Sequence, residues 1–314
     1  MAINQNQIVV NAHRAGKGIR MVLVNIFLSL FLAAAKIVAG FLGNSYALIT
    51  DGIESLMDIF SSTVVWGGLR IGARPPDKNY PFGHGRAESL AAMTVSVTLI
   101  GVAIGIAVQS VREIFTPHHA PALFTLFVLV GVIFVKEVMY RFLLKTGEDI
   151  DSNALKADAW HSRSDALTSL AAFIGISVSL IGGKGYESAD DWAALFASGV
   201  IFYNGSRLLR SAVAEVMDAA VSFDFEDKVK SLSRNVPGVI DIEKCRIRKS
   251  GFDYFIEIHV IVNGTISVAD GHRIGHEVKK VLFDAELGVI DVVPHIEPAG
   301  LREFKDKREK FKKE

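Results

Sequence analysis

The sequence predicts an α-helical membrane protein with six transmembrane helices, followed by a small α+β domain of αββαβ order. Three observations lead to this prediction. Half of the 314 residues are hydrophobic, although the carboxyl-terminal part is polar. Six apolar segments have the length of about 17–25 residues that a spanning helix needs. After Asp218 the pattern changes to short amphipathic helices and alternating strands.

The six apolar segments follow one another with short connections. The second and fifth are less apolar than the others because they carry regularly spaced acidic residues. The fifth is most apolar over 167–181, and we extend it backwards through His161. The expected spans are 19–42, 46–71, 87–111, 122–144, 161–181 and 192–209.

The carboxyl-terminal domain is predicted from hydrophobic periodicity and turn signals. A helix over 225–236 ends at Pro237-Gly238, and Lys249-Ser250-Gly251 marks a hairpin between two alternating strands. A further helix and strand follow, and the tail is a run of charges typical of a solvated end. The later elements are the strands 239–248 and 252–262, the helix 267–283 and the strand 289–296. The expected division is an amino-terminal segment 1–18, a transport domain 19–210, a regulatory and dimerisation domain 211–298 and a tail 299–314.

Charge distribution predicts the orientation and excludes one class of partner. The 34 Lys and Arg balance the 34 Asp and Glu, and without a basic block we expect no nucleic-acid partner. Basic residues gather in the connections around 70–88 and 141–163, whereas the opposite loops are nearly bare. By the positive-inside rule, both termini are cytoplasmic.

The remaining indications of location are weaker. Cys245 is the single cysteine, which excludes an intrachain disulfide framework and a Cys-rich zinc module, and fits a reducing compartment. The polar amino terminus predicts no cleaved signal peptide. We expect a multi-pass protein of a bacterial inner membrane.

Two ladders of ionisable residues interrupt the second and fifth spans. One is Asp51–Glu54–Asp58 and the other is Asp158–His161–Asp165. Steps of three and seven residues return to one face of a helix. Carboxylates and an imidazole at membrane depth are costly unless they pair with each other or with a cation.

The i, i+4 pairs of the two ladders predict a metal site. Glu54 and Asp58 from one helix, with His161 and Asp165 from another, supply four ligands, enough for a tetrahedral shell. Without the ion, crowded like charges favour proton uptake, so metal and proton compete for one site, as an exchange transporter requires. Asp51 and Asp158 are interpreted as supporting groups beside the ligands or on the ion's access path. The alternative is structural ion pairing with a nearby base: Lys36, Lys136, Arg141 or Arg163.

These residues resemble the cation diffusion facilitator family of divalent metal cation/proton antiporters. Three motifs carry the resemblance in order: Asp51 to Asp58, the run Tyr-Pro-Phe-Gly-His-Gly-Arg-Ala-Glu-Ser over 80–89, and Ala157 to Asp165. The resemblance covers roughly residues 12–298. It implies a homodimer in a lipid bilayer with a metallochaperone-like, ferredoxin-like αββαβ domain in the cytoplasm.

The resemblance also implies further sites. In the connection after the second span, Asp77 and His84 match a second metal site of some members, while Tyr80 stands where those members have a histidine. His84 is equally well interpreted as a structural loop residue. In the cytoplasmic domain, a binuclear metal site shared with the neighbouring subunit is implied at Glu243, His259, His272, His295 and Glu297. Arg86 and Asp218 match an inter-subunit electrostatic lock.

The resulting expectation is a secondary transporter that exports a divalent transition metal from the cytoplasm by proton antiport with alternating access. Zn²⁺ is favoured as substrate and regulator, with Fe²⁺, Mn²⁺, Co²⁺ and Cd²⁺ as alternatives. Glu54 stands where many zinc carriers have His, and three carboxylates with one imidazole favour harder ions. The alternative function is a non-transporting metal sensor or partner subunit. An enzyme is not expected, because no His-Glu-x-x-His is present and four protein ligands leave no open position.

Overall fold

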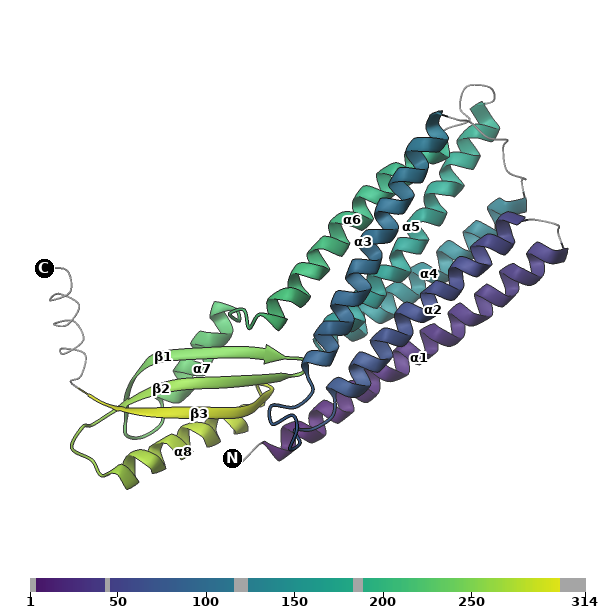
Figure 1. The fold of residues 1–314 in the computed structure, drawn as a ribbon. Helices are drawn as coiled ribbons and strands as arrows, with labels where there is room; N and C mark the ends of the chain where they lie inside the picture. Colours follow the sequence, from purple (N-terminus) through teal and green to yellow (C-terminus); the bar gives the residue numbers. More distant parts are fainter. Residues whose placement is uncertain (1–3, 43–45, 116–123, 183–188, 300–314) are drawn as a thin grey trace, which may run out of the picture. The chain divides into compact units, whose positions relative to one another are not determined.

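The computed structural model describes residues 4–42, 46–115, 124–182 and 189–299, and it divides the chain into two compact units. One unit is His13–Val216, and the other joins Met1–Ala12 to Met217–Glu314. Figure 1 shows long helices in the first and a sheet with two helices in the second. This arrangement confirms the predicted combination of a helical unit with a small α+β domain.

The described residues of the first unit form six long helices, of which α1 begins in the other unit. Helices α3 and α6, α4 and α5, and α5 and α6 pack along each other, and α2 packs on both α3 and α5. A close approach joins α2 to α3 at Gly68, where an added Cβ would overlap the Cβ of Ala91. The helices are α1 (Gln5–Leu42), α2 (Tyr46–Gly72), α3 (Arg86–Phe115), α4 (Phe124–Asp149), α5 (Asn153–Gly182) and α6 (Ala189–Val216).

Helices α1 and α5 begin eight or more residues earlier than the apolar pattern predicts. Helix α1 starts at Gln5, because a polar segment can extend a helix that its apolar continuation has already nucleated. Helix α5 starts at Asn153, where the Ser152 hydroxyl accepts a hydrogen bond from the backbone N–H of Leu155 (3.1 Å). A serine in this position caps the first turn of a helix.

The helical unit exposes large apolar side chains and buries several polar ones among apolar neighbours. Large apolar side chains point outward on several helices, with exposed fractions between 68% and 83%, namely Phe27, Phe31, Phe127, Phe134 and Phe196. Ionisable and hydroxyl side chains are buried instead, among them Lys136, Asp158, His161, Ser62 and Ser96. Among the described residues, Gln5–Ala35 and Arg86–Arg112 are long and apolar enough to cross a membrane by length and composition. This distribution fits a lipid-facing surface.

The second unit is a three-stranded sheet covered by helices on one face. Strand β1 (Val239–Ser250) pairs antiparallel with β2 (Asp253–Val262), and β2 pairs parallel with β3 (Val289–Pro298), in the order β1-β2-β3. The covering helices are α7 (Phe223–Arg234) and α8 (Val268–Asp284).

Side-chain alternation separates the two faces of this sheet. Ile256, Ile258 and Val260 of β2 join Val229 of α7 and Val278 of α8 in one buried cluster. Because successive side chains of a strand point to opposite faces, the odd-numbered residues of β2 lie on the face away from the helices. That face carries the imidazoles described below.

Candidate functional site

Helix α5 presents the second predicted ladder on one stripe. Asp158 and His161 are buried, while the Asp165 side chain is 26% exposed. Helix α5 packs against α2, which carries the first ladder along its backbone. The side chains of Asp51, Glu54 and Asp58 lie outside the described residues, so their part in the site stays a prediction.

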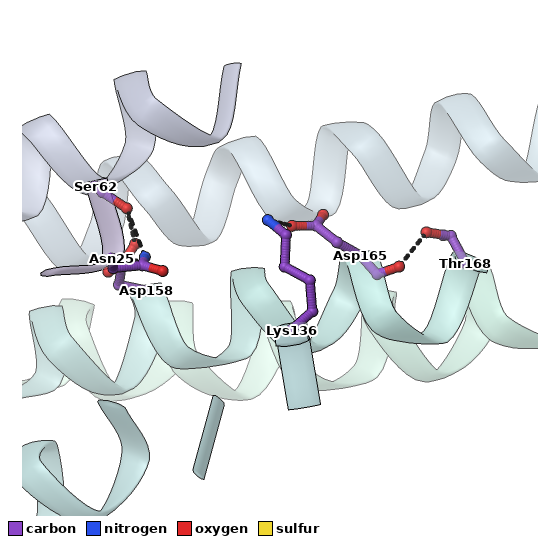
Figure 2. A network of polar contacts seen from close by, with 6 residues as sticks. All are labelled: Asn25, Ser62, Lys136, Asp158, Asp165 and Thr168. Carbon is purple, nitrogen blue, oxygen red and sulfur yellow. Dashed lines mark hydrogen bonds and ion pairs between the residues drawn. The ribbon is translucent and has the colours of Figure 1, made fainter. Parts of the chain in front are cut away.

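Asp158 accepts hydrogen bonds from neutral donors on two other helices. Its Oδ1 accepts a hydrogen bond from the Ser62 hydroxyl (2.8 Å), and its Oδ2 accepts one from the Asn25 side-chain amide (3.2 Å). The Asn25 amide also donates to Ser62 Oγ (3.0 Å), which closes the network shown in Figure 2. The three residues come from α1, α2 and α5, so the network joins these helices at one level. A buried polar network is stable only when its members are satisfied.

Asp165, seven residues further along α5, has a different partner. The Lys136 ammonium of α4 donates to its Oδ2 at 2.9 Å, and Figure 2 shows the two side chains meeting. The Thr168 hydroxyl donates a hydrogen bond to the Asp165 backbone carbonyl (3.0 Å) and not to its carboxylate. Of the four bases considered as ion-pair partners from sequence, Lys136 therefore reaches a predicted ligand. Arg141 and Arg163 instead approach Glu137, and the Lys36 side chain lies outside the described residues.

The connection between α2 and α3 brings Asp77 and His84 together. His84 Nε2 lies 3.5 Å from Asp77 Oδ2, and the Tyr80 ring lies against the imidazole with a centroid separation of 4.5 Å. Asp77 Oδ1 also accepts hydrogen bonds from the backbone N–H groups of Asn79 and Tyr80, both at 2.8 Å. The Tyr80 N–H is the main cause that lowers the pKa of Asp77. The Asp77 carboxylate and the His84 imidazole supply two metal ligands, and the Tyr80 phenol ring lies beside them. This is a poor cation site, since protein metal sites use three or more ligands.

The face of the sheet away from α7 and α8 carries a compact set of side chains that could hold a metal ion. His259 pairs with His295 across the parallel strands β2 and β3, and Glu297 follows two residues later on β3. One ligand atom from each of the three lies within 4.8 Å of the others. Glu297 Oε1 is 2.7 Å from His259 Nδ1 and 3.6 Å from His295 Nε2. Two imidazoles and a carboxylate form a donor set suited to Zn²⁺ and similar ions.

The other two predicted ligands of this domain lie outside that set. Glu243 lies at an irregularity of β1, where the pairing with β2 shifts between Ile242 and Lys244. His272 is exposed on α8, beside His276 with ring centroids 4.5 Å apart. It is exposed because Gly271, Ile274 and Gly275 take the buried face of the helix. A role for Glu243 and His272 in a site shared between subunits stays a prediction.

The predicted lock residues belong to different units of the chain. Arg86 begins α3, and Asp218 follows α6 with a positive φ of 55°. In its own unit, Asp218 Oδ2 lies 3.7 Å from an Arg248 guanidinium nitrogen. A pairing of Arg86 with Asp218 between subunits is a property of a dimer and stays a prediction.

Cys245 is not poised as a metal ligand or nucleophile. Burial raises the pKa of its thiol to about 11, and the nearby Glu226 carboxylate adds to this effect. Since the thiolate is the reactive form, we expect maleimide labelling at neutral pH about 100-fold slower than for an ordinary thiol. Labelling of the detergent-solubilised chain over a pH series measures this, with the denatured chain as control. Equal rates in the folded and denatured chains would contradict the burial.

Sequence reasoning did not find the partners of Asp158, nor decide which base pairs with Asp165. Asn25, Ser62 and Lys136 are buried polar residues inside apolar spans. A polar residue at such a position is itself a signal, because it needs a partner inside the protein. Which partner it meets depends on helix packing.

Comparison with known proteins supports the assignment of both units. The model of the cation efflux transmembrane domain matches residues 22–217, and that of the cation efflux protein cytoplasmic domain matches 221–299. The manganese efflux system protein MneP of Bacillus subtilis is 28% identical over 89% of this chain and 95% of its own. Metal tolerance protein 2 of Oryza sativa subsp. japonica is 31% identical over 84% of this chain and 74% of its own.

A solved structure of the MamM CTD covers 24% of this chain and 95% of its own, at 19% identity and a TM-score of 0.24. The family models span both units, and the transmembrane model makes the chain an integral membrane protein. Members of this family move metal ions and are not enzymes. The chain therefore belongs to the cation diffusion facilitator family of metal cation efflux transporters.

Proposed function

We propose that the protein exports a divalent transition metal ion from the cytoplasm in exchange for protons. The observation that carries this proposal is the stripe of Asp158, His161 and Asp165 within a helical unit whose exterior is apolar. Ionisable groups inside a membrane bundle mark ion pathways, because their burial is too costly to keep without a use.

The ion is bound by Glu54 and Asp58 of α2 with His161 and Asp165 of α5. Each pair is spaced by one helical turn, and the two helices pack against each other. Protonation of His161 and a carboxylate on the outer side releases the ion, and helix movement exposes the site to each side in turn. Asp158 stays with Asn25 and Ser62 as a supporting group that holds α5 in register.

The donor set bears on the choice of ion. Zn²⁺ is the ion favoured by the family resemblance, but three carboxylates and one imidazole form a harder set than zinc sites usually have. Mn²⁺ and Fe²⁺ prefer such oxygen-rich sites. The relative MneP is named for manganese efflux. We therefore place Mn²⁺ beside Zn²⁺ as the ions to test first, ahead of Fe²⁺, Co²⁺ and Cd²⁺.

The cytoplasmic domain would sense the metal and strengthen a homodimer. His259, His295 and Glu297 leave coordination positions open, which a neighbouring subunit can fill. With basic loops on the same side as the termini, both termini lie in the cytoplasm, and the host membrane is the bacterial inner membrane.

Metal uptake into inside-out proteoliposomes with an acidic lumen tests this function. We expect uptake of Mn²⁺ or Zn²⁺ that requires the proton gradient and is lost in Asp58→Ala. The panel of Mn²⁺, Zn²⁺, Fe²⁺, Co²⁺ and Cd²⁺ identifies the ion. Absence of flux for every metal, from protein whose cytoplasmic cluster still binds metal, would instead favour a membrane metal sensor or partner subunit.

A further inference from the structure

Lys136 is a buried cation directed at a proposed metal ligand. It lies on α4 with its side chain 5% exposed, and its ammonium is 2.9 Å from Asp165 Oδ2 on α5. Figure 2 shows the lysine stem reaching toward the Asp165 carboxylate, while Asp158 keeps its own neutral partners. A lysine at this depth is costly unless its charge is balanced by a partner.

The ion pairs of Arg141 and Arg163 differ from that of Lys136 in both depth and partner. Arg141 is paired with Glu137 at 2.9 Å, with an arginine side chain that is 76% exposed. Arg163 approaches the same Glu137 at 4.0 Å and lies over the Tyr140 ring. Neither of these contacts uses a residue of the proposed ion site. Of these three bases, Lys136 is the one that is buried and paired with a member of that site.

We propose that Lys136 is a tethered counter-cation of the transport site, which competes with the metal ion for Asp165. The inference rests on the proposed function, because it assumes that Asp165 is a ligand. An ion that takes Oδ2 of Asp165 must displace the ammonium or share the carboxylate with it. Either event weakens metal binding, since the lysine charge repels a divalent cation at short range.

The net charge of the site explains what this competition contributes to transport. Three carboxylates carry three negative charges, and a divalent ion leaves one of them uncompensated. Lys136 cancels that remaining charge when the ion is bound. After release, protonation of His161 and one carboxylate leaves a single net negative charge on the site, and Lys136 cancels that charge as well. It therefore lowers the electrostatic cost of the helix movement that exposes the site to each side in turn. The same cation keeps the affinity low enough for release, so Lys136 is a determinant of affinity and turnover.

Lys136→Gln is the variant that tests this role. We expect it to bind Mn²⁺ or Zn²⁺ at least about tenfold more tightly than the parent at fixed neutral pH. In transport, KM should fall and the maximal rate should fall with it, because release becomes slower. Equilibrium dialysis of the full detergent-solubilised chain gives the dissociation constant, and proteoliposome flux gives the rates. Both parent and variant carry His259→Ala and His295→Ala, which removes the cytoplasmic cluster from the measurement.

Matched controls separate this role from a structural one. Lys145→Gln removes a charge from an exposed position of the same helix and should leave the dissociation constant unchanged. Lys136→Arg keeps the cation and should stay close to the parent. If Lys136→Gln elutes differently from the parent in size-exclusion chromatography, Lys136→Met is used in its place, because methionine keeps the apolar stem of the lysine.

The direction in which the metal dissociation constant changes in Lys136→Gln decides between the two roles. A structural ion pair would leave metal binding unchanged or weaken it when Lys136 is removed, and either result would overturn the inference. Tighter binding supports it. If the parent itself neither binds metal in the membrane domain nor transports it, the proposed function fails instead. The two failures are thus distinguishable.

Discussion

Replacing His161 by alanine is expected to reduce metal flux by about 100-fold or more. His161 is buried on α5 and supplies the only nitrogen donor of the proposed four-ligand set. Its loss leaves three carboxylates, which bind a transition metal less selectively. Initial uptake rates in proteoliposomes measure the effect.

His276→Ala is the matched control for this variant. It removes the same side chain from an exposed position of α8 and should leave flux unchanged. Size-exclusion profiles of both variants show whether the fold is kept. Flux in His161→Ala at the parental rate would contradict the assignment of this imidazole to the transport site.

Replacing His259 by alanine is expected to weaken metal binding by the cytoplasmic cluster by about 100-fold. His259 bridges the cluster, because its Nδ1 lies 2.7 Å from Glu297 and its ring lies 4.9 Å from that of His295. The remaining histidine and carboxylate form an incomplete shell. The number of ions bound per chain at equilibrium should fall, while flux at saturating metal persists.

Equilibrium dialysis of the full chain measures that number, with His276→Ala again as the matched control. An unchanged number of bound ions in His259→Ala would show that the cluster is not a metal site. Loss of flux at saturating metal would show that the cytoplasmic cluster does more than tune activity.

The sequence was informative wherever a repeating pattern determines local structure. Apolar runs of spanning length predicted the six long helices, and strand alternation with the hairpin signal at 249–251 predicted the αββαβ order. Spacing of three and four residues also predicted that Asp158, His161 and Asp165 share one stripe of a helix.

Contacts between distant segments were harder to predict. Four bases were within sequence reach of the ladders, and only packing of α4 against α5 selects Lys136 for Asp165. The Asp158 network needs Asn25 from α1, 133 residues away in the chain. In the cytoplasmic domain, parallel pairing of β2 with β3 brings His259 beside His295, whereas the buried face of α8 keeps His272 outward.

Coupling of metal movement to proton movement is the central claim, and a metal-driven pH change tests it most directly. Inside-out proteoliposomes containing a pH-sensitive dye start with equal pH on both sides, and the metal is then added outside. The account predicts that entry of Mn²⁺ or Zn²⁺ makes the lumen alkaline. In His161→Ala, both the metal entry and the rise in luminal pH should be lost. Metal entry without any change of luminal pH would contradict antiport.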